Sequence, residues 1–253
     1  MKIRFALIIA FFCSWMGTVF SQDIGILAKE AENLERQLKE PEALAKYKQI
    51  IVIEPNNVKY LVKAAELEVA IGGREKEEKS KRLFFESAMA YAQRALKADA
   101  NSADANYAMA TVSGKMTDLD IENKKIVAYV KDVKDYADKA LSINPNHGRA
   151  NYTLGKWHYE MVTLSGIKKA AVKLFYGGLP NGDLDKAISY MEKSRTIEPY
   201  FVTNQLDLAK AYKENRQPAK AIEVLERLVK MPNRSFNDIA LKADGAKLLA
   251  SLQ

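Results

Sequence analysis

The sequence predicts an all-α fold built from repeated helix pairs, and three observations support this. Apolar residues recur at three- and four-residue steps along most of the chain, which is the spacing of one helix face. The 253 residues include 12 Gly and 7 Pro, a scarcity that favours long helical segments. A helix stop of similar sequence also recurs at a fixed interval, which is typical of a helical-repeat solenoid.

The recurring stop is an isoleucine, a polar residue and a proline. It occurs at Ile53-Glu54-Pro55, Ile143-Asn144-Pro145 and Ile197-Glu198-Pro199. Pro55, Ala100 and Pro145 lie 45 residues apart, and the same interval separates Ala105-Asn106-Tyr107 from Ala150-Asn151-Tyr152. A sequence that resembles itself at such a period predicts stacked copies of one supersecondary unit.

The elements follow from this pattern in order. Residues 24–38 and 41–54 predict a short first helix pair, with Pro41 in the first turn of its second helix, where proline is tolerated. Residues 202–233 predict the last pair, and Ile239 to Leu252 predict a C-terminal capping helix that covers the last apolar face. We expect about four long, irregular units in all.

The middle units are longer than the last one. We place their additional residues at the connections 72–79 and 116–120, where polar and turn-forming residues gather. A further insertion, residues 161–182, separates the two helices of the unit that ends at Pro199.

The first residues predict a secretory leader. Lys2 and Arg4 precede the uncharged apolar run from Phe5 to Val19, and Ser21 ends a site that a signal peptidase could accept. We therefore expect a signal peptide over residues 1–21, a repeat domain over residues 22–253, and a secreted or periplasmic protein. The run is shorter than the ~20 residues of a membrane span, so we favour a cleaved leader. The alternative is a membrane anchor formed by an uncleaved N-terminal helix.

Composition argues against several classes of function. The single cysteine, Cys13, lies in the predicted leader, so the mature chain would have neither a disulfide nor a thiolate nucleophile. The net charge is +7, but the lysines are interspersed with glutamates. A nucleic-acid interface would gather cations and aromatic residues on one face, so we expect no nucleic-acid partner.

The last unit resembles the tetratricopeptide repeat. That repeat carries Leu-Gly/Ala and Tyr on its first helix, Ala on its second helix, and a final Pro. The matching residues here are Leu208-Ala209-Lys210-Ala211-Tyr212, Ala221-Ile222 and Pro232. The resemblance implies a superhelix whose first helices line a concave groove.

A second resemblance covers residues from about 100 to the end. Leu154-Gly155-Lys156-Trp157-His158-Tyr159-Glu160, followed by Leu174-Phe175-Tyr176-Gly177-Gly178-Leu179-Pro180, resembles the regulator of microtubule dynamics family. That resemblance implies association with membranes, with microtubules and, in some members, with phospholipid. Because a secreted or periplasmic protein does not meet tubulin, we do not expect microtubules as a partner.

Helical spacing predicts which side chains face the groove. If Gly155 is the packing position of its helix, the opposite side carries tyrosines and cations. The predicted groove residues are Tyr107, Arg149, Tyr152, Lys156, Tyr159, Lys210 and Lys213. Such a lining suits an acidic peptide, a terminal carboxylate or a lipid phosphate. Alternatively, the tyrosines pack between repeats and the lysines are solvated.

The insertion is the second candidate site, because its helix is basic and amphipathic. Its candidate membrane-contacting or lid residues are Ile167, Lys168, Lys169, Lys173, Leu174 and Phe175. They could lie on an anionic membrane surface or cover an apolar pocket. Alternatively, the helix packs on the repeats and its lysines are solvated.

No pattern of catalytic residues is visible. His147 and His158, the only histidines, have no acidic or cysteine partners at metal-ligand spacing, and we place His147 in the turn that starts a helix. No phosphate-binding glycine loop or serine–histidine–acid motif is present.

We therefore predict a non-enzymatic binding scaffold of the cell envelope, without metal or cofactor, that holds a protein or peptide partner in its groove. The alternative is a phospholipid carrier in which the groove and the insertion enclose the acyl chains, with Arg149 and Lys156 on the phosphate.

Overall fold

A computed structural model describes residues 24–164, 166–177 and 181–253. The predicted signal peptide, residues 1–21, lies outside the described residues. The side chains of residues 165–168 also lie outside them, so the predicted roles of Ile167 and Lys168 have no structural counterpart.

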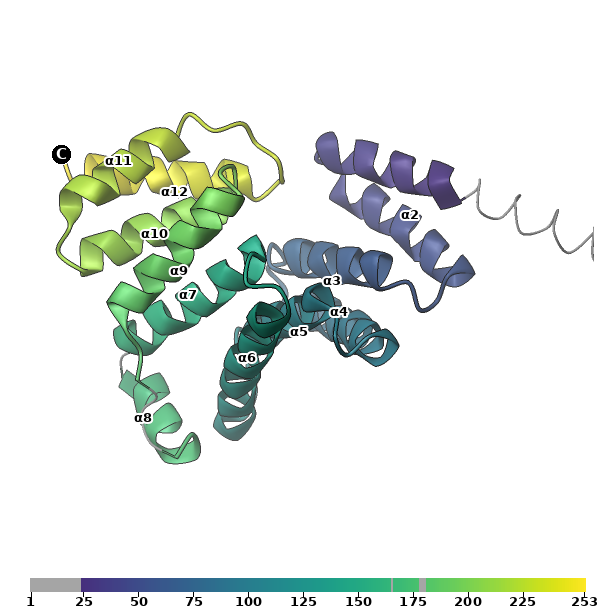
Figure 1. Cartoon of the computed structure of the whole chain (residues 1–253), viewed down its shortest axis with the longest axis horizontal. Helices are drawn as coiled ribbons and strands as arrows, with labels where there is room; N and C mark the ends of the chain where they lie inside the picture. Colours follow the sequence, from purple (N-terminus) through teal and green to yellow (C-terminus); the bar gives the residue numbers. More distant parts are fainter. Residues whose placement is uncertain (1–23, 165, 178–180) are drawn as a thin grey trace, which may run out of the picture.

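The described residues form helices joined by short connections, which confirms the predicted all-α helical-repeat fold (Figure 1). The helices are residues 24–36, α2 (Glu40–Ile53), α3 (Val58–Gly72), α4 (Glu78–Ala98), α5 (Ala103–Met116), α6 (Asn123–Ile143), α7 (Gly148–Thr163), α8 (Gly166–Phe175), α9 (Leu184–Ile197), α10 (Val202–Glu214), α11 (Pro218–Leu228) and α12 (Asp238–Ala250).

Five antiparallel pairs and α12 make up the array, rather than about four units. The pairs are residues 24–36 with α2 (Figure 1), which Lys46 and Glu30 join by an ion pair, and α3 with α4, α5 with α6, α7 with α9, and α10 with α11. The first and last pairs are shorter than the 45-residue period of the middle units. The chain therefore holds more pairs than that period predicts. Helix α8 is the predicted insertion between α7 and α9, and α12 is the predicted capping helix.

The additional residues of the middle units lie mainly in their second helices. Helices α4 and α6 each have 21 residues, whereas α9 has 14. At about 3.6 residues per turn, the difference is about two turns. The prediction that the connections hold these residues was therefore largely wrong, because the polar residues there belong partly to the exposed faces of longer helices.

Local polar contacts fix where the units begin. Ser102 and His147 precede α5 and α7, and their side chains accept hydrogen bonds from the main-chain N–H groups of Ala105 and Ala150 at 3.2 and 3.0 Å. Such caps satisfy helix N–H groups that have no partner within the helix. The predicted position of His147 at a helix start is therefore confirmed.

Buried amides hold the turns between units. The Asn106 side chain donates to the carbonyl of Ala100 at 3.1 Å, and the Asn151 side chain donates to that of Pro145 at 3.1 Å. The Gln205 amide makes the matching bond to Pro199. The asparagine of the repeated Ala-Asn-Tyr motif therefore stabilises the turn, because its side-chain amide donates a hydrogen bond to a main-chain carbonyl that the turn leaves free.

Small residues set the distance between paired helices. Gly155 on α7 lies against α9 so closely that a Cβ atom there would be 2.9 Å from both the Ala187 carbonyl oxygen and Met191 Cγ. On α3, a Cβ atom at Gly72 would lie 2.5 Å from Cβ of Phe84. Contacts this short are not sterically allowed, so these positions require glycine as long as the helices keep their spacing.

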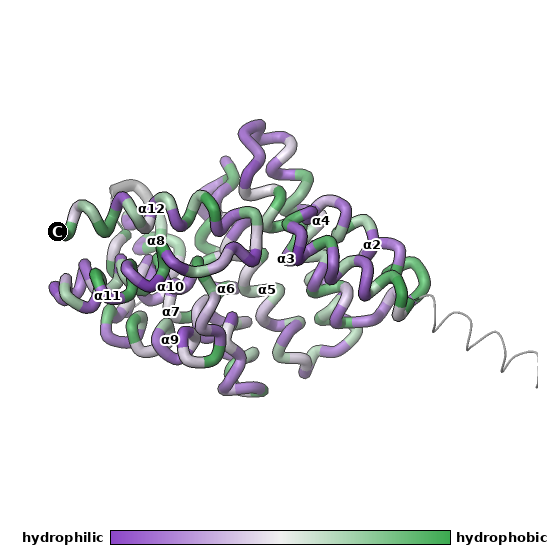
Figure 2. The backbone as a smooth tube through the Cα atoms, turned by 90° about the horizontal axis from the view of Figure 1, so that it is seen from above, coloured by the Kyte–Doolittle hydropathy of each residue, from purple (hydrophilic) through white to green (hydrophobic). Residues whose placement is uncertain are grey.

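The core runs through the whole array in several clusters, the largest of which joins residues 24–36 to α5. Figure 2 shows hydrophilic and hydrophobic segments alternating along the tube, as expected for helices that bury one face. None of the described helices combines the length and apolar character needed to cross a membrane.

The two ends of the array meet. The main-chain N–H of Phe236, in the loop before α12, donates to the carboxylate of Glu40 at 3.0 Å, across 196 positions of sequence. Arg74 pairs with Glu40 at 2.7 Å and donates to the Asn237 side chain at 2.8 Å. Figure 1 shows this loop extending from α11 toward the first helices. We call these four residues the end clasp.

The close approach at Gly155 predicts a stability effect. Replacing Gly155 by Ala should lower the free energy of unfolding by about 1–3 kcal/mol, because the added methyl group overpacks the contact with α9. Gly114 is the matched control, since its nearest neighbour would be 3.6 Å from an added Cβ. Gly114→Ala should stabilise by about 0.5–1 kcal/mol through helix propensity. Urea denaturation measures both, and equal changes would contradict the packing assignment.

The end clasp predicts a second effect. Arg74→Met should destabilise the protein by about 1–3 kcal/mol, because the buried Glu40 carboxylate loses its cation. The Phe236 amide should also exchange its hydrogen faster. Arg82 is the control, because it is half-buried and, within the described residues, hydrogen-bonds only the Asp120 carbonyl; Arg82→Met should stay within about 0.5 kcal/mol. Unchanged exchange at Phe236 in Arg74→Met would count against the clasp.

Candidate functional site

The first helices of successive pairs lie next to one another and form the inner surface of the curve. Helices α3, α5, α7 and α10 follow in this order, and α12 packs beside α10. We call the surface that they share the concave face (Figure 1). All seven predicted groove residues belong to these helices, so the surroundings of these residues decide what the face can bind.

Asp207 on α10 is the centre of the polar contacts on this face. The Tyr152 hydroxyl donates to its carboxylate at 2.8 Å, and the ammonium groups of Lys156 and Lys210 lie 3.2 and 3.0 Å away. Burial alone would raise the pKa of Asp207, but the two lysines and the Tyr152 hydroxyl outweigh burial and lower it. Asp207 therefore stays ionised and joins α7 to α10.

A second group of polar contacts lies on the same face, between the Asp207 contacts and α3. Arg149 pairs with Glu198 at 2.7 Å, and its guanidinium group lies 3.8 Å from the centre of the Phe201 ring. Tyr107 is buried, and its hydroxyl donates to Glu66 on α3 at 3.0 Å. Burial first, and then the Glu66 carboxylate, raise the pKa of Tyr107, so its phenol stays protonated. Tyr107 therefore joins α5 to α3, and Arg149 joins α7 to the turn between α9 and α10.

An open cleft lies beside the Asp207 group, where α7, α10 and α12 meet. It has a volume of about 340 Å³. Its lining consists of Tyr159, Leu206, Lys210, Lys213, Glu214, Asp244 and Leu248. We call it the inner cleft. Tyr159, Leu206 and Leu248 supply apolar surface, and the remaining four side chains carry charges of both signs.

The structure thus divides the predicted groove residues into two sets. Tyr159, Lys210 and Lys213 line the inner cleft. Tyr107, Tyr152 and Lys156 use their polar groups in contacts between units, and Arg149 pairs with Glu198 at the end of its own unit. Among the ion pairs of the described residues, Lys213 has no partner, so its ammonium group remains available to a ligand.

Sequence reasoning missed the anions of this face. Glu66, Glu198 and Asp207 each accept a hydrogen bond from a predicted groove residue, yet they lie 41 to 55 positions from those residues in sequence. Helical spacing relates residues on one helix only.

The helix of the insertion buries one side and exposes the predicted residues that the structure describes. Ala171 and Val172 are buried, whereas Leu174 is 72% exposed and Phe175 is 42% exposed. Lys169 and Lys173 are also exposed. Leu174 and Phe175 therefore present apolar surface outward beside two cations.

No group of three or more His, Cys, Asp or Glu residues in the described part of the chain is placed to hold a metal ion. His147 caps α7 and contacts Asp104, and His158 is buried between Trp157 and Tyr190.

Comparison with known proteins assigns the family. The family described as Regulator of microtubule dynamics protein 1-3 matches residues 27–253. The chain belongs to this family. The predicted resemblance to the regulator of microtubule dynamics family is therefore confirmed, and it extends further toward the N-terminus than the residues that first indicated it. No curated protein matches the chain in sequence.

Solved structures show the same fold in distant proteins. TTC0263, a thermophilic tetratricopeptide-repeat protein of Thermus thermophilus, matches with a TM-score of 0.64 and 12% identity, over 90% of this chain and 99% of that chain. Pseudomonas aeruginosa pilF matches with a TM-score of 0.51 and 13% identity, over 92% of this chain and 90% of that chain. At these identities the likeness shows a tetratricopeptide-like fold for this member of the regulator of microtubule dynamics family.

Asp207 predicts a pH dependence. Its pKa is lower in the folded protein than in the unfolded chain, so its stabilising contribution is complete above about pH 4 and is lost as the pH falls through the folded pKa. Asp207→Asn should lower the free energy of unfolding by about 1.5–3 kcal/mol at pH 7. It should also reduce the loss of stability that the parent protein shows as the pH falls below about 4.

The control is Asp244→Asn, because Asp244 is exposed and pairs only with Lys247 among the described residues. It should change stability by less than about 0.5 kcal/mol. Chemical denaturation at a series of pH values measures both variants. If Asp207→Asn lost as much stability at acid pH as the parent does, ionised Asp207 would not be the group that stabilises the contact between α7 and α10.

Proposed function

We propose that this protein is a non-enzymatic scaffold of the cell envelope that holds a protein or peptide partner on its concave face. The inner cleft is the observation that carries this proposal. It combines apolar surface from Tyr159, Leu206 and Leu248 with Lys213, Glu214 and Asp244 at its edge. An apolar anchor surrounded by charges of both signs suits a peptide side chain and its polar neighbours.

The distribution of charge favours a peptide over a phosphate group. Arg149 is already paired with Glu198, and Lys156 and Lys210 share Asp207. A phosphate placed there would have to compete with carboxylates that lie within 3.2 Å of these cations. A peptide can instead use the apolar surface of the inner cleft and form a single contact with Lys213.

Location in the envelope rests on the predicted leader, residues 1–21. N-terminal sequencing of the protein from its own host tests this part of the proposal. A mature chain that begins at Gln22 would support secretion or a periplasmic location. A chain that keeps Met1 and fractionates with membranes would support the alternative of an uncleaved anchor.

The insertion favours a second candidate function, contact with phospholipid. Exposed Leu174 and Phe175 beside Lys169 and Lys173 offer apolar and basic groups together, as surface-bound helices do. Native mass spectrometry before and after organic extraction tests whether the protein carries lipid. A bound phospholipid that is extracted would favour the lipid function over the peptide scaffold.

Site-specific photo-crosslinking in the native host tests the scaffold proposal. A photoreactive phenylalanine analogue at position 159 should form a discrete adduct with a partner protein. The same analogue at Gln93, an exposed position on α4, should not. Lys213→Glu should reduce the yield at position 159 by about tenfold, because it places a like charge opposite an anionic contact.

Two outcomes would contradict the scaffold function. One is the absence of any protein adduct at position 159 in cells that produce the folded protein. The other is the same set of adducts at positions 159 and 93, which would indicate nonspecific collisions. Circular dichroism of each variant verifies that the helical fold is retained.

A further inference from the structure

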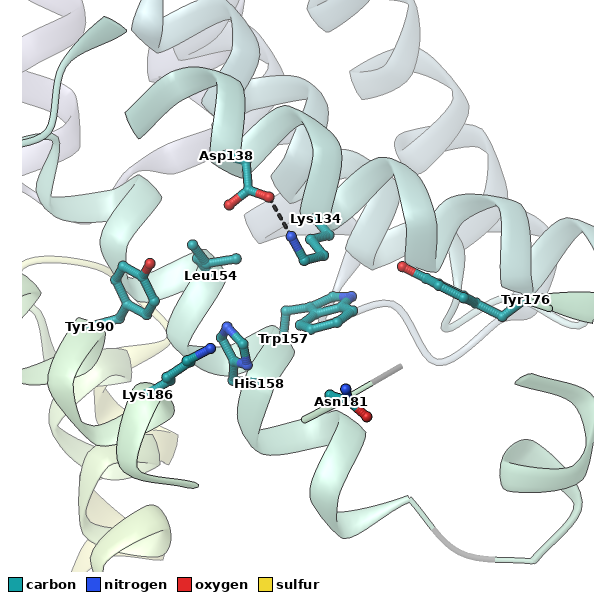
Figure 3. A pocket seen from close by; sticks show the side chains of 9 residues that line it. All are labelled: Lys134, Asp138, Leu154, Trp157, His158, Tyr176, Asn181, Lys186 and Tyr190. Atoms are coloured by element: carbon teal, nitrogen blue, oxygen red, sulfur yellow. Dashed lines mark hydrogen bonds and ion pairs between the residues drawn. The ribbon is translucent and has the colours of Figure 1, made fainter. Parts of the chain in front are cut away.

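A second pocket lies outside the concave face, between α6, α7 and α9 and next to the insertion (Figure 3). Its volume is about 430 Å³, within the range of small-molecule sites. We call it the outer pocket. Leu154, Trp157 and His158 come from α7, and Lys186 and Tyr190 come from α9. Tyr176, which follows α8, lines the side nearest the insertion.

Aromatic rings form much of the lining. The Trp157 ring is fixed because its indole N–H donates to the Val130 carbonyl at 3.0 Å. The His158 ring meets Trp157 edge-on at 5.2 Å and stacks on Tyr190 at 5.9 Å. Rings held in this way offer preformed apolar surface to a planar group.

His158 is a polar group without a protein partner in the described part of the structure. Its side chain is 6% exposed, and its buried Nδ1 atom has no hydrogen bond. Burial first, and then the charge of Lys186, lower the pKa of His158, so the ring is neutral near pH 7. A neutral imidazole carries one N–H group, so the ring can donate one hydrogen bond to an occupant of the pocket.

The charges around the pocket do not cancel. The Lys134 ammonium pairs with Asp138, as the dashed line in Figure 3 shows. Lys186 points toward His158 in the same view, and the ion pairs of the described residues include none for Lys186. One ammonium group of the lining therefore has no ion-pair partner within the described residues, and it lies beside a neutral imidazole and aromatic rings.

We propose that the outer pocket binds an aromatic carboxylate, with its ring against Trp157 and Tyr176 and its carboxylate on Lys186 and His158. This chemistry has two sources, a free aromatic acid or the C-terminal aromatic residue of a protein chain. The outer pocket is separate from the inner cleft, so this proposal is tested independently of the scaffold function.

Titration calorimetry with three probes tests the proposal. The probes are 3-phenylpropionate, N-acetyl-phenylalanine and N-acetyl-phenylalanine amide. Both acids should bind saturably and shift the indole N–H resonance of Trp157, whereas the amide should bind at least about tenfold more weakly because it lacks the charge. Tighter binding of 3-phenylpropionate would identify a free acid as the ligand, and tighter binding of N-acetyl-phenylalanine would identify a chain terminus.

Variants on one exposed face of α9 make the test specific. Lys186→Met should weaken binding of both acids by about tenfold, and Lys186→Arg should restore affinity to within about threefold. Lys193→Met is the matched control, because Lys193 is exposed on the same helix but does not line the pocket; it should bind like the parent. Three results would overturn the proposal: no saturable binding, equal binding of the amide, or full affinity in Lys186→Met.

Discussion

The close packing of paired helices at small residues is the constraint on which this structure depends. Gly155 and Gly72 bring their helices so close that a methyl group would not fit, and fully buried alanines such as Ala88 and Ala137 continue these contacts. Side-chain size at a crossing sets the distance between helices. Since each pair packs on the next, this distance also sets the curvature of the array, and the curvature places α7, α10 and α12 around one cleft.

Curvature also explains why the ends meet. A solenoid is held together by contacts between neighbouring units, but here Glu40 and Arg74 contact the loop that contains Phe236. Asp238 supports that loop by accepting hydrogen bonds from the main-chain N–H groups of Arg234 and Ser235 at 2.7 and 2.9 Å. The clasp adds a long-range contact to an array of local ones, so it limits how far the concave face can open.

The fold could be predicted from sequence because its determinants are local. The stop at Pro145, the cap at His147 and the glycine at 155 act within one unit, and a period reveals them. The polar contacts of the concave face could not be predicted, because Asp207 is joined to Tyr152 across 55 positions. The groove was expected to offer tyrosines and cations to a ligand, yet Glu198 and Asp207 pair with Arg149, Lys156 and Lys210. The outer pocket was missed for the same reason, since three helices contribute to it.

Helix α7 links the two proposed sites through its periodicity. Tyr152, Lys156 and Tyr159 recur at steps of four and three and face α10 and α12. Leu154, Trp157 and His158 occupy the other side of the helix and line the outer pocket. A single helix can serve two sites because residues three and four apart share a face, and the two sets lie on different faces of α7. Gly155, between the two sets, holds α7 against α9, so the packing that fixes the fold also fixes the relative position of both sites.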